Sequence, residues 1–404
     1  MEFLIPTRTS RPSDDPIFAL NTEARARAAA GEAIINATVG ALLDDEGRLS
    51  VLGSVAQTLR EVPPNVGAGY APIEGDASFL KAVVADVMGQ RPEADWTVAI
   101  ATPGGSGALR LAMADFLDTG QAALTTSYFW GPYRTIADEL DRGLATFRMF
   151  DANGRLDGAD LEHTLSAQIE AQGRALLFIN SPCHNPTGYS FDADEWRQLA
   201  AIVGRAADRA PVTLLIDIAY ARYGQRSLDE AVDALLGLAG RALLLFAWSA
   251  SKSFTQYGLR VGALLAVHPD PEARRRIRSA LSYSCRGTWS NCNAGGMAAI
   301  GRALTDPDLR ARTDQERAAL KSLLDRRVEA WNSLATDAGL RYPRYDGGFF
   351  TTVFCADAFA VAARLKEEGI FVVPQTGALR VALCSVAERD IPRLVQGIAR
   401  HVTR

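Results

Sequence analysis

A lysine and an aspartate at the ends of apolar runs are the first residues that could carry chemistry. Lys252 ends the segment Ser249-Ala-Ser-Lys252, directly after the apolar run 242–248. Because a buried ammonium is costly, this position favours a lysine that forms an imine with a cofactor aldehyde, although a loop lysine would share the pattern. Asp217 ends the run 212–217. A buried carboxylate there needs a partner, such as a protonated pyridine nitrogen, unless it simply caps a helix.

A glycine-rich turn could hold a phosphate. Gly105 and Ser106 lie in Pro103-Gly-Gly-Ser-Gly107, which leads into a helical sequence, and such turns at helix N-termini cradle phosphates. The turn lacks both the Walker A Gly-Lys-Ser/Thr and the full GxGxxG pattern. It therefore favours one phosphate monoester and argues against an NAD-dependent oxidoreductase. Arg260, in Tyr257-Gly-Leu-Arg260-Val-Gly262, could clamp that phosphate with two hydrogen bonds or be a surface arginine.

Two polar side chains could contact the ring of such a cofactor. Asn185 lies in Asn180-Ser-Pro-Cys-His184-Asn185-Pro-Thr-Gly188, a turn sequence that follows the apolar run 175–180. At this position Asn185 would donate to the phenolate oxygen of a pyridine ring, and Tyr220 could contact the same oxygen. His184 is more often structural than catalytic in such a turn.

Short apolar runs alternate with amphipathic segments and must position these residues. Runs that are apolar on both faces and bounded by Gly, Pro, Ser or Asn are typical of parallel strands covered by helices. Helices are predicted between several of them, for example over residues 107–117 and 192–209. This alternation indicates an α/β domain with its function at the carboxyl ends of the strands. The candidate strands are 97–101, 121–125, 175–180, 212–217, 242–249 and 262–267.

The pattern changes in the last hundred residues. A long, charge-rich helix is predicted from residue 306 to about 339. Further strands and helices follow it and predict a smaller α+β domain, which the first 45 residues join. The sequence thus predicts a large domain over 46–310 and a small domain from 1–45 and 311–404. The elements expected after the long helix are strands near 349–354, 371–374 and 380–383, a helix over 357–368 and a closing helix from 388.

Composition narrows the class of protein. The chain has 404 residues, a net charge of −4 and a pI near 5.7, so no nucleic-acid partner is expected. The basic stretch 274–278 is interpreted as the solvent-exposed face of a helix. Five cysteines without a CxxC pair suggest neither a zinc site nor a disulfide framework. The first residues lack the apolar core of a signal peptide, and no apolar run is long enough to span a membrane. We therefore expect a soluble, cytoplasmic protein.

Taken together, the order and spacing of these motifs resemble the class I and II aminotransferases of pyridoxal-phosphate (PLP) fold type I. The subgroup that the chain resembles most is that of the aspartate and aromatic amino-acid aminotransferases. The resemblance runs from about residue 34 to residue 383. It implies a large domain with a mostly parallel sheet flanked by helices, and a smaller α+β domain. The motifs that carry it are Gly104-Gly-Ser-Gly107, His184-Asn-Pro-Thr-Gly188, Asp217-Ile-Ala-Tyr220, Ser249-Ala-Ser-Lys252 and Arg260-Val-Gly262.

The resemblance implies a cofactor site for PLP. Lys252 would form the Schiff base and shuttle the proton, and Asp217 would pair with the pyridine nitrogen. Asn185 and Tyr220 would contact the ring oxygen. Trp130, in Tyr128-Phe-Trp-Gly-Pro-Tyr133, would stack on the ring, with Tyr128 as the alternative. The residues implied to hold the phosphate are Gly105, Ser106, Ser249, Ser251 and Arg260.

The resemblance also implies substrate contacts and a homodimer. Arg380 would bind the α-carboxylate of the substrate, and Asn185 would also contact the substrate. Tyr70, in Tyr70-Ala-Pro-Ile-Glu-Gly75, would reach the phosphate of the neighbouring subunit. Arg286 would cross to the partner's site and meet a side-chain carboxylate. These roles place the active sites at a subunit interface.

Two departures from the family pattern bear on specificity. Thr38 stands where the aspartate enzymes carry a glycine over the substrate, so the pocket is narrower. Gly131-Pro-Tyr133 replaces the usual Gly-Asn-His after the stacking tryptophan, which changes the surroundings of Asp217. Both changes leave transamination intact but question strict aspartate specificity, so tyrosine or phenylalanine could also be accepted.

The predicted function is a ping-pong transamination between an L-amino acid and a 2-oxo acid such as 2-oxoglutarate. The expected donors are aspartate, glutamate or an aromatic amino acid. Another PLP-dependent reaction, by a C–S or β-lyase or a decarboxylase, remains the alternative, because the cofactor residues do not discriminate among these reactions. A regulatory protein on the same fold is disfavoured, since only about 45 residues precede the large domain and the Lys–Asp–Arg set is intact.

Overall fold

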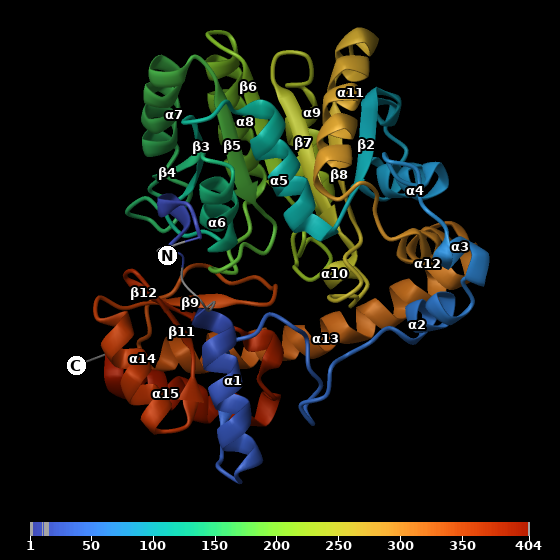
Figure 1. Cartoon of the computed structure of the whole chain (residues 1–404). Coiled ribbons are helices and arrows are strands. Elements are labelled where there is room, and N and C mark those ends of the chain that lie inside the picture. The colour runs from blue at the N-terminus through green and yellow to red at the C-terminus, as the bar shows by residue number, and fades with distance from the viewer. Residues whose placement is uncertain (1–2, 10, 12–15, 403–404) are drawn as a thin grey trace. The chain divides into compact units, whose positions relative to one another are not determined.

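The computed structural model of the chain describes residues 3–9, 11 and 16–402 and divides into two compact units (Figure 1). The large unit consists of Ser50–Asp325 and Pro343–Phe349, and the small unit of Met1–Leu49, Arg326–Tyr342 and Phe350–Arg404. This division differs from the domain limits predicted from the sequence at residues 46–49, 311–325 and 343–349. The largest difference arises because one continuous helix, α13 (Pro307–Asp337), contributes residues to both units.

A seven-stranded sheet forms the centre of the large unit, in the order β2-β8-β7-β6-β5-β3-β4. Strands β3 to β7 are parallel where they pair, and β8 is antiparallel to both β2 and β7. Six strands coincide closely with the predicted runs. The edge strand β4 was missed because its residues alternate in burial and form no continuous apolar run. The strands are β2 (Thr97–Thr102), β3 (Ala122–Thr126), β4 (Gly143–Phe147), β5 (Ala175–Asn180), β6 (Val212–Asp217), β7 (Leu243–Ser249) and β8 (Gly262–Val267).

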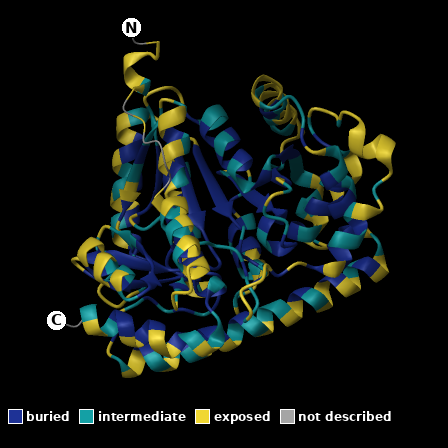
Figure 2. Ribbon diagram, turned by 60° about the horizontal axis from the view of Figure 1, so that its bottom comes forward, coloured by how far each residue is buried: buried dark blue, intermediate teal, exposed yellow. Residues whose placement is uncertain are grey.

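Helices cover both faces of this sheet. Because successive side chains of a strand point to opposite faces, Leu176 and Phe178 join one hydrophobic cluster while Leu177 and Ile179 join the other. The first cluster includes helices α5 (Gly104–Phe116), α6 (Pro132–Glu139) and α11 (Pro271–Thr288). Of these, α5 and α11 lie in front of the strands in Figure 1. Figure 2 shows the strands buried between helices whose outer surfaces are exposed.

The opposite face carries the other long helices of the large unit. Its cluster contains residues of α4 (Ala77–Met88), α7 (Gly158–Gln172), α8 (Ala193–Ala207), α9 (Leu228–Leu236) and α12 (Ala294–Thr305). The short helices are α2 (Gly53–Arg60), α3 (Pro64–Ala68), α10 (Ala250–Ser253) and a 3-10 turn over Pro92–Trp96.

A buried carboxylate anchors the segment 343–349 to the large unit. Glu195 is 1% exposed and forms a capping box with Asp192 at the start of α8. Its carboxylate also accepts hydrogen bonds from Tyr189 Oη at 2.5 Å and from Arg344 Nη2 at 3.0 Å. Charge-assisted contacts of this kind are strong, and they fix the segment that ends at Phe349.

The small unit contains two short sheets. Strand β1 (Ile35–Asn36) pairs in parallel with β10 (Ile370–Phe371), which ties the N-terminal residues to the C-terminal segment. The second sheet has the order β11-β12-β9 and is antiparallel. The remaining elements are a 3-10 turn over Pro6–Arg8, α1 (Pro16–Ala29), β9 (Thr351–Phe354), α14 (Ala358–Glu367), β11 (Val373–Gln375), β12 (Ala378–Val381), 3-10 turns over Leu383–Ser385 and Glu388–Asp390, and α15 (Ile391–Val402).

The sequence predicted no membrane-spanning run and no disulfide framework, and two observations concern these predictions. Within the described part of the chain, none of the helices has the length and apolar character needed to cross a membrane. All five cysteines are buried free thiols.

Candidate active site

Asp217 lies at the carboxyl end of β6, between the ends of β5 and β7. Its side chain is buried, with the residue 7% exposed. Oδ2 accepts a hydrogen bond from Tyr133 Oη at 2.8 Å, and Oδ1 accepts one from the Ala219 amide at 3.2 Å. Burial raises the pKa of Asp217, while the Tyr133 hydroxyl, the Ala219 amide and the positive charge of Lys252 oppose that rise. A cationic ligand at this place would offset the cost of desolvation further.

Lys252 lies in α10, which directly follows β7, and its ammonium is surrounded by aromatic rings. Nζ is 4.6 Å from the ring centre of Tyr257, 5.6 Å from that of Tyr220 and 5.7 Å from that of Phe349. Ring faces attract a cation at such distances. The rings therefore stabilise a charged Lys252 and limit the access of water to it.

Hydrogen bonds connect Asn185 to Tyr220 directly and to Asp217 through Asn180. Asn185 Nδ2 donates to Tyr220 Oη at 3.3 Å. The amide of Asn185 donates to Asn180 Oδ1 at 2.7 Å, and Asn180 Nδ2 donates to the Asp217 carbonyl at 2.8 Å. Asn180 was missed by the sequence reasoning. Its position at the end of an apolar run, like that of Asp217, was the available signal.

Arg260 reaches back over the glycine-rich turn. Nη1 donates to Ser251 Oγ at 3.2 Å, and Nη2 donates to the Pro103 carbonyl at 3.2 Å. Gly104 has a φ of +71°, and a Cβ there would come within 2.5 Å of Arg260 Nη2. Glycine is therefore required at this position, both for the backbone conformation and for the close approach of the guanidinium.

The N-terminus of α5 completes a cradle for an anion. Gly105 and Ser106 occupy its first turn, where backbone amides have no partner within the helix. Among the described residues, no side chain caps this helix end. Ser249 lies beside it, since a Cβ built on Gly105 would be 3.5 Å from Ser249 Cβ, and Ser249 Oγ accepts from the Ser251 amide at 3.2 Å. Amides, hydroxyls and a guanidinium thus converge on a site suited to one phosphate.

The two aromatic candidates for ring stacking have different neighbours. The ring of Trp130 packs edge-on against Tyr133, with centroids 5.9 Å apart, and Tyr133 contacts Asp217. The ring of Tyr128 packs against Phe150, with centroids 6.2 Å apart. Trp130 is therefore connected to the Asp217 side of the site through Tyr133.

His184 has the surroundings of a structural residue. It is buried, and its Nδ1 lies 2.8 Å from Thr187 Oγ1 within the same turn. Burial lowers the pKa of His184 to about 3, so the imidazole is neutral at physiological pH. The neutral ring thus stabilises the turn that carries Asn185 through its contact with Thr187. It also connects this turn to Thr126, whose Oγ1 lies 3.3 Å from Nε2 of His184.

Tyr70 and Arg286 are exposed on the large unit. Tyr70 is 95% exposed, between α3 and α4. Arg286 is exposed in the last turn of α11, where Nη1 donates to Ser290 Oγ at 2.5 Å. Neither side chain belongs to the buried cluster around Asp217.

Thr38 and Arg380 belong to the small unit and contact each other. Both are buried, and Arg380 Nη2 donates to the Thr38 carbonyl. The Arg380 guanidinium lies 4.7 Å from the ring centre of Phe350. Thr38 Oγ1 donates to Asn36 Oδ1 at 2.6 Å, so its hydroxyl is directed to its own loop.

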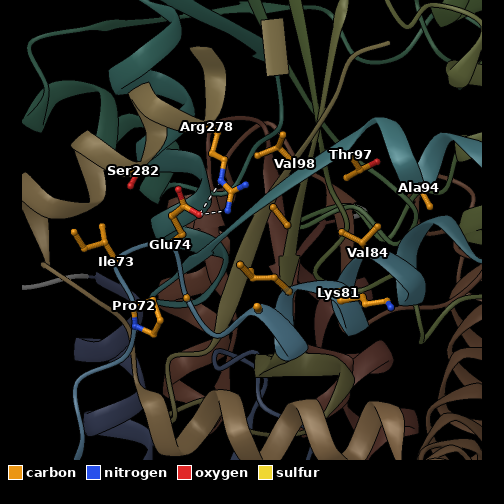
Figure 3. A pocket seen from close by; sticks show the side chains of 14 residues that line it. Pro72, Ile73, Glu74, Lys81, Val84, Ala94, Thr97, Val98, Arg278 and Ser282 are labelled. Carbon is orange, nitrogen blue, oxygen red and sulfur yellow. Dashed lines mark hydrogen bonds and ion pairs between the residues drawn. The ribbon is translucent and has the colours of Figure 1, made fainter. Parts of the chain in front are cut away.

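A surface pocket of about 690 Å³ lies at the edge strand β2, with α4 and α11 contributing to its walls (Figure 3). Its polar groups include the ion pair between Glu74 and Arg278, and most of the other lining side chains are apolar. Among the described residues, those that line it include none of the predicted site residues.

The chain is similar to named aminotransferases over nearly its whole length. An aspartate aminotransferase of Pseudomonas aeruginosa is 31% identical over 402 residues, which cover 96% of this chain and 96% of that protein. An aromatic-amino-acid aminotransferase of Paracoccus denitrificans is 28% identical, with 95% and 96% covered. The crystal structure of an aminotransferase from Anaerococcus prevotii is 32% identical, covers 100% of both chains and has a TM-score of 0.94.

The sequence model of the family described as aminotransferase class I and II matches residues 32–398. Members of this family use PLP. Neither the match nor the names of the relatives favour the alternative of a lyase or a decarboxylase. The chain therefore belongs to the class I and II aminotransferases and is a PLP-dependent transaminase that moves an amino group between an amino acid and a 2-oxo acid.

Proposed function

We propose that the amino donor of this enzyme is aspartate, glutamate or an aromatic L-amino acid, and that the acceptor is a 2-oxo acid such as 2-oxoglutarate. The two half-reactions would alternate in a ping-pong sequence. The names of the Pseudomonas and Paracoccus relatives support this range of donors. The observation that carries the assignment of residues is the arrangement of Lys252, Asp217 and the Asn185–Tyr220 pair at the ends of three adjacent strands.

The residues at these strand ends fit the cofactor chemically. Asn185 Oδ1 is buried and has no hydrogen-bond partner among the described residues, so a polar ligand group would complete the surroundings of this amide. The carboxylate of Asp217 suits a cationic ring nitrogen. The cradle between α5 and Arg260 suits the phosphate. The residues that would hold it are Gly105, Ser106, Trp130, Asn185, Asp217, Tyr220, Ser249, Ser251, Lys252 and Arg260.

Each of these side chains would have a distinct task in catalysis. Bound PLP would supply an electron sink for the electron pair that remains when the α-proton leaves. Lys252 Nζ, in its uncharged amine form, would accept that proton and release it again. Asp217 would hold a proton on the ring nitrogen, and Tyr220 and Asn185 would orient the ring oxygen. The rings around Nζ would exclude water, which strengthens these electrostatic interactions.

Carboxylate recognition falls to two arginines in this proposal. Arg380 would bind the α-carboxylate, because a buried planar guanidinium suits a paired hydrogen bond to a carboxylate. Arg286 would meet the side-chain carboxylate of a dicarboxylic donor. Thr38 would narrow the substrate pocket, since its side chain is larger than hydrogen.

We further propose a cytoplasmic homodimer. The exposure of Tyr70 and Arg286 supports roles in a partner's site, since an exposed aromatic and an arginine are typical of interfaces. Five buried free thiols suit a reducing compartment.

A donor screen tests the proposed specificity. The absorbance of the purified holoprotein would be followed in the near-ultraviolet and visible while single amino acids are added without an acceptor. Aspartate, glutamate or tyrosine should bleach the visible band, and 2-oxoglutarate should restore it. Bleaching by none of these donors would refute the proposed donor range. Release of ammonia or pyruvate without an acceptor would indicate lyase activity instead.

Arg286→Ala should separate the two donor classes. We expect kcat/KM for aspartate to fall by about 100-fold, because a charge-assisted pair is lost, and kcat/KM for tyrosine to change by less than about threefold. Arg276→Ala, an exposed arginine of the same helix α11, is the matched control and should change neither value. Equal losses for both donors would remove Arg286 from side-chain recognition.

Mixed dimers test whether Arg286 acts across an interface. Lys252→Ala and Arg286→Ala homodimers should both be nearly inactive toward aspartate. In a heterodimer, one site would combine Lys252 of one subunit with Arg286 of the other. Coexpression should then restore about a quarter of the wild-type aspartate activity, if the subunits associate at random. No recovery in heterodimers that have been verified by mass spectrometry would contradict an exchange of Arg286 between subunits.

A further inference from the structure

Tyr133 is a buried phenol whose hydroxyl is bonded to Asp217. The residue is 1% exposed, and Oη donates to Asp217 Oδ2 at 2.8 Å. Among the described residues, Tyr133 is the side chain that donates a hydrogen bond to this carboxylate; the other donor is the backbone amide of Ala219. Burial raises the pKa of Tyr133 well above its ordinary value, and the charge of Asp217 adds to this effect, so the phenol keeps its proton.

The position of this phenol is fixed by packing. Tyr133 lies in the first turn of α6, directly after Gly131 and Pro132. Its ring makes edge-on contacts with Trp130, at 5.9 Å between centroids and 88°, and with Phe178, at 5.4 Å and 80°. A side chain held on two sides by aromatic rings loses little further entropy when its hydroxyl bonds a carboxylate. The packing that fixes the ring thus also aims the hydroxyl at Oδ2.

A second phenol–carboxylate pair in the same unit shows what differs at Asp217. Tyr189 Oη donates to the buried Glu195, but Arg344 Nη2 also lies 3.0 Å from that carboxylate. The charge of Glu195 is therefore neutralised by a guanidinium. At Asp217 the hydrogen-bond donors are neutral, and the cation that acts on it is Lys252. A cationic ring nitrogen at Asp217 would therefore meet a carboxylate whose hydrogen-bond donors carry no charge.

We propose that Tyr133 is a positioning residue, which holds Asp217 ionised and oriented so that its charge keeps the ring nitrogen of the cofactor protonated. This inference rests on the proposed pairing of Asp217 with that nitrogen. A neutral donor serves this purpose better than a cationic one. A hydrogen bond to the anion favours the anion, whereas a cation at Oδ2 would compete with the ring for the same charge.

Tyr133→Phe removes the hydroxyl and keeps the aromatic side chain. Its effect is best measured as the protonation state of the ring nitrogen of the cofactor. Holoprotein would be prepared with PLP labelled with ¹⁵N in the ring, whose nitrogen resonance reports protonation. The wild-type resonance should be that of a protonated ring at neutral pH. In the variant it should move toward the unprotonated position, and the dissociation constant for PLP should rise by about tenfold or more, the range for a hydrogen bond to a charged group.

Two further variants separate positioning from a general loss of stability. Tyr189→Phe removes the equivalent hydrogen bond at Glu195 and should leave the ¹⁵N resonance and PLP affinity unchanged. In an Asp217→Asn background, Tyr133→Phe should no longer shift the resonance, because its effect acts through the carboxylate. An unchanged resonance in Tyr133→Phe, or an equal effect in both backgrounds, would overturn the proposal. A wild-type ring that is unprotonated would instead overturn the pairing of Asp217 with the ring, which is a separate outcome.

Discussion

Replacing Lys252 with alanine is expected to lower kcat for transamination by at least about 10⁴-fold while the fold survives. A general base alone contributes up to about this factor, and the same residue would also supply the covalent attachment of the cofactor. The remaining residues of the site, including Asp217 and Arg260, stay in place, so PLP should still bind without a covalent link. Steady-state rates with aspartate and tyrosine, together with circular dichroism, measure the two effects.

Borohydride trapping identifies the attachment lysine directly. The chain has four lysines, Lys81, Lys252, Lys321 and Lys366, so each can be resolved by peptide mass mapping. Reduction of the wild-type holoprotein should leave the cofactor mass on the peptide that contains Lys252. Lys81→Ala, at an exposed position on α4, is the control and should retain full activity. Cofactor mass on another lysine, or appreciable turnover by Lys252→Ala, would refute the assignment.

Asp217→Asn is expected to lower kcat/KM by about 150- to 5,000-fold. Removing one partner of a buried ion pair costs about 3–5 kcal/mol, which corresponds to this range. Asparagine keeps the shape of the side chain but cannot carry the charge that would hold a proton on the ring nitrogen. The loss should appear in kcat as much as in kcat/KM, since the charge matters most when electrons enter the ring.

The matched control is Glu195→Gln, which neutralises another buried carboxylate with a tyrosine donor. This change should lower the melting temperature, because Arg344 then loses one of its three charged partners, the other two being Asp192 and Asp346. It should leave the ¹⁵N resonance of ring-labelled PLP unchanged. If Asp217→Asn behaved like Glu195→Gln, with lower stability but intact catalysis, Asp217 would be a structural acid and not the partner of the ring.

The sequence by itself determined the strands and the residues at their ends. The runs 175–180, 212–217 and 262–267 coincide with β5, β6 and β8. They were readable because strands covered on both faces are apolar throughout and end sharply at polar residues or glycine. The edge strand β4 lacks that property, and it was missed. Lys252 and Asp217 were singled out because a polar side chain at the end of a buried run needs a partner, and Asn185 was singled out because it lies in the turn that follows such a run.

Only the tertiary structure decided which of these residues meet. Tyr133 and Asp217 are 84 positions apart, and their hydrogen bond depends on α6 packing against the face of the sheet that also buries Phe178. The link from Asn180 to Asp217 likewise requires β5 and β6 to be neighbours. A local pattern reports the burial of a segment but not its neighbours, because strand order and helix packing are set by the whole core. The identity of the donor to Asp217 therefore came from the fold and not from the motif.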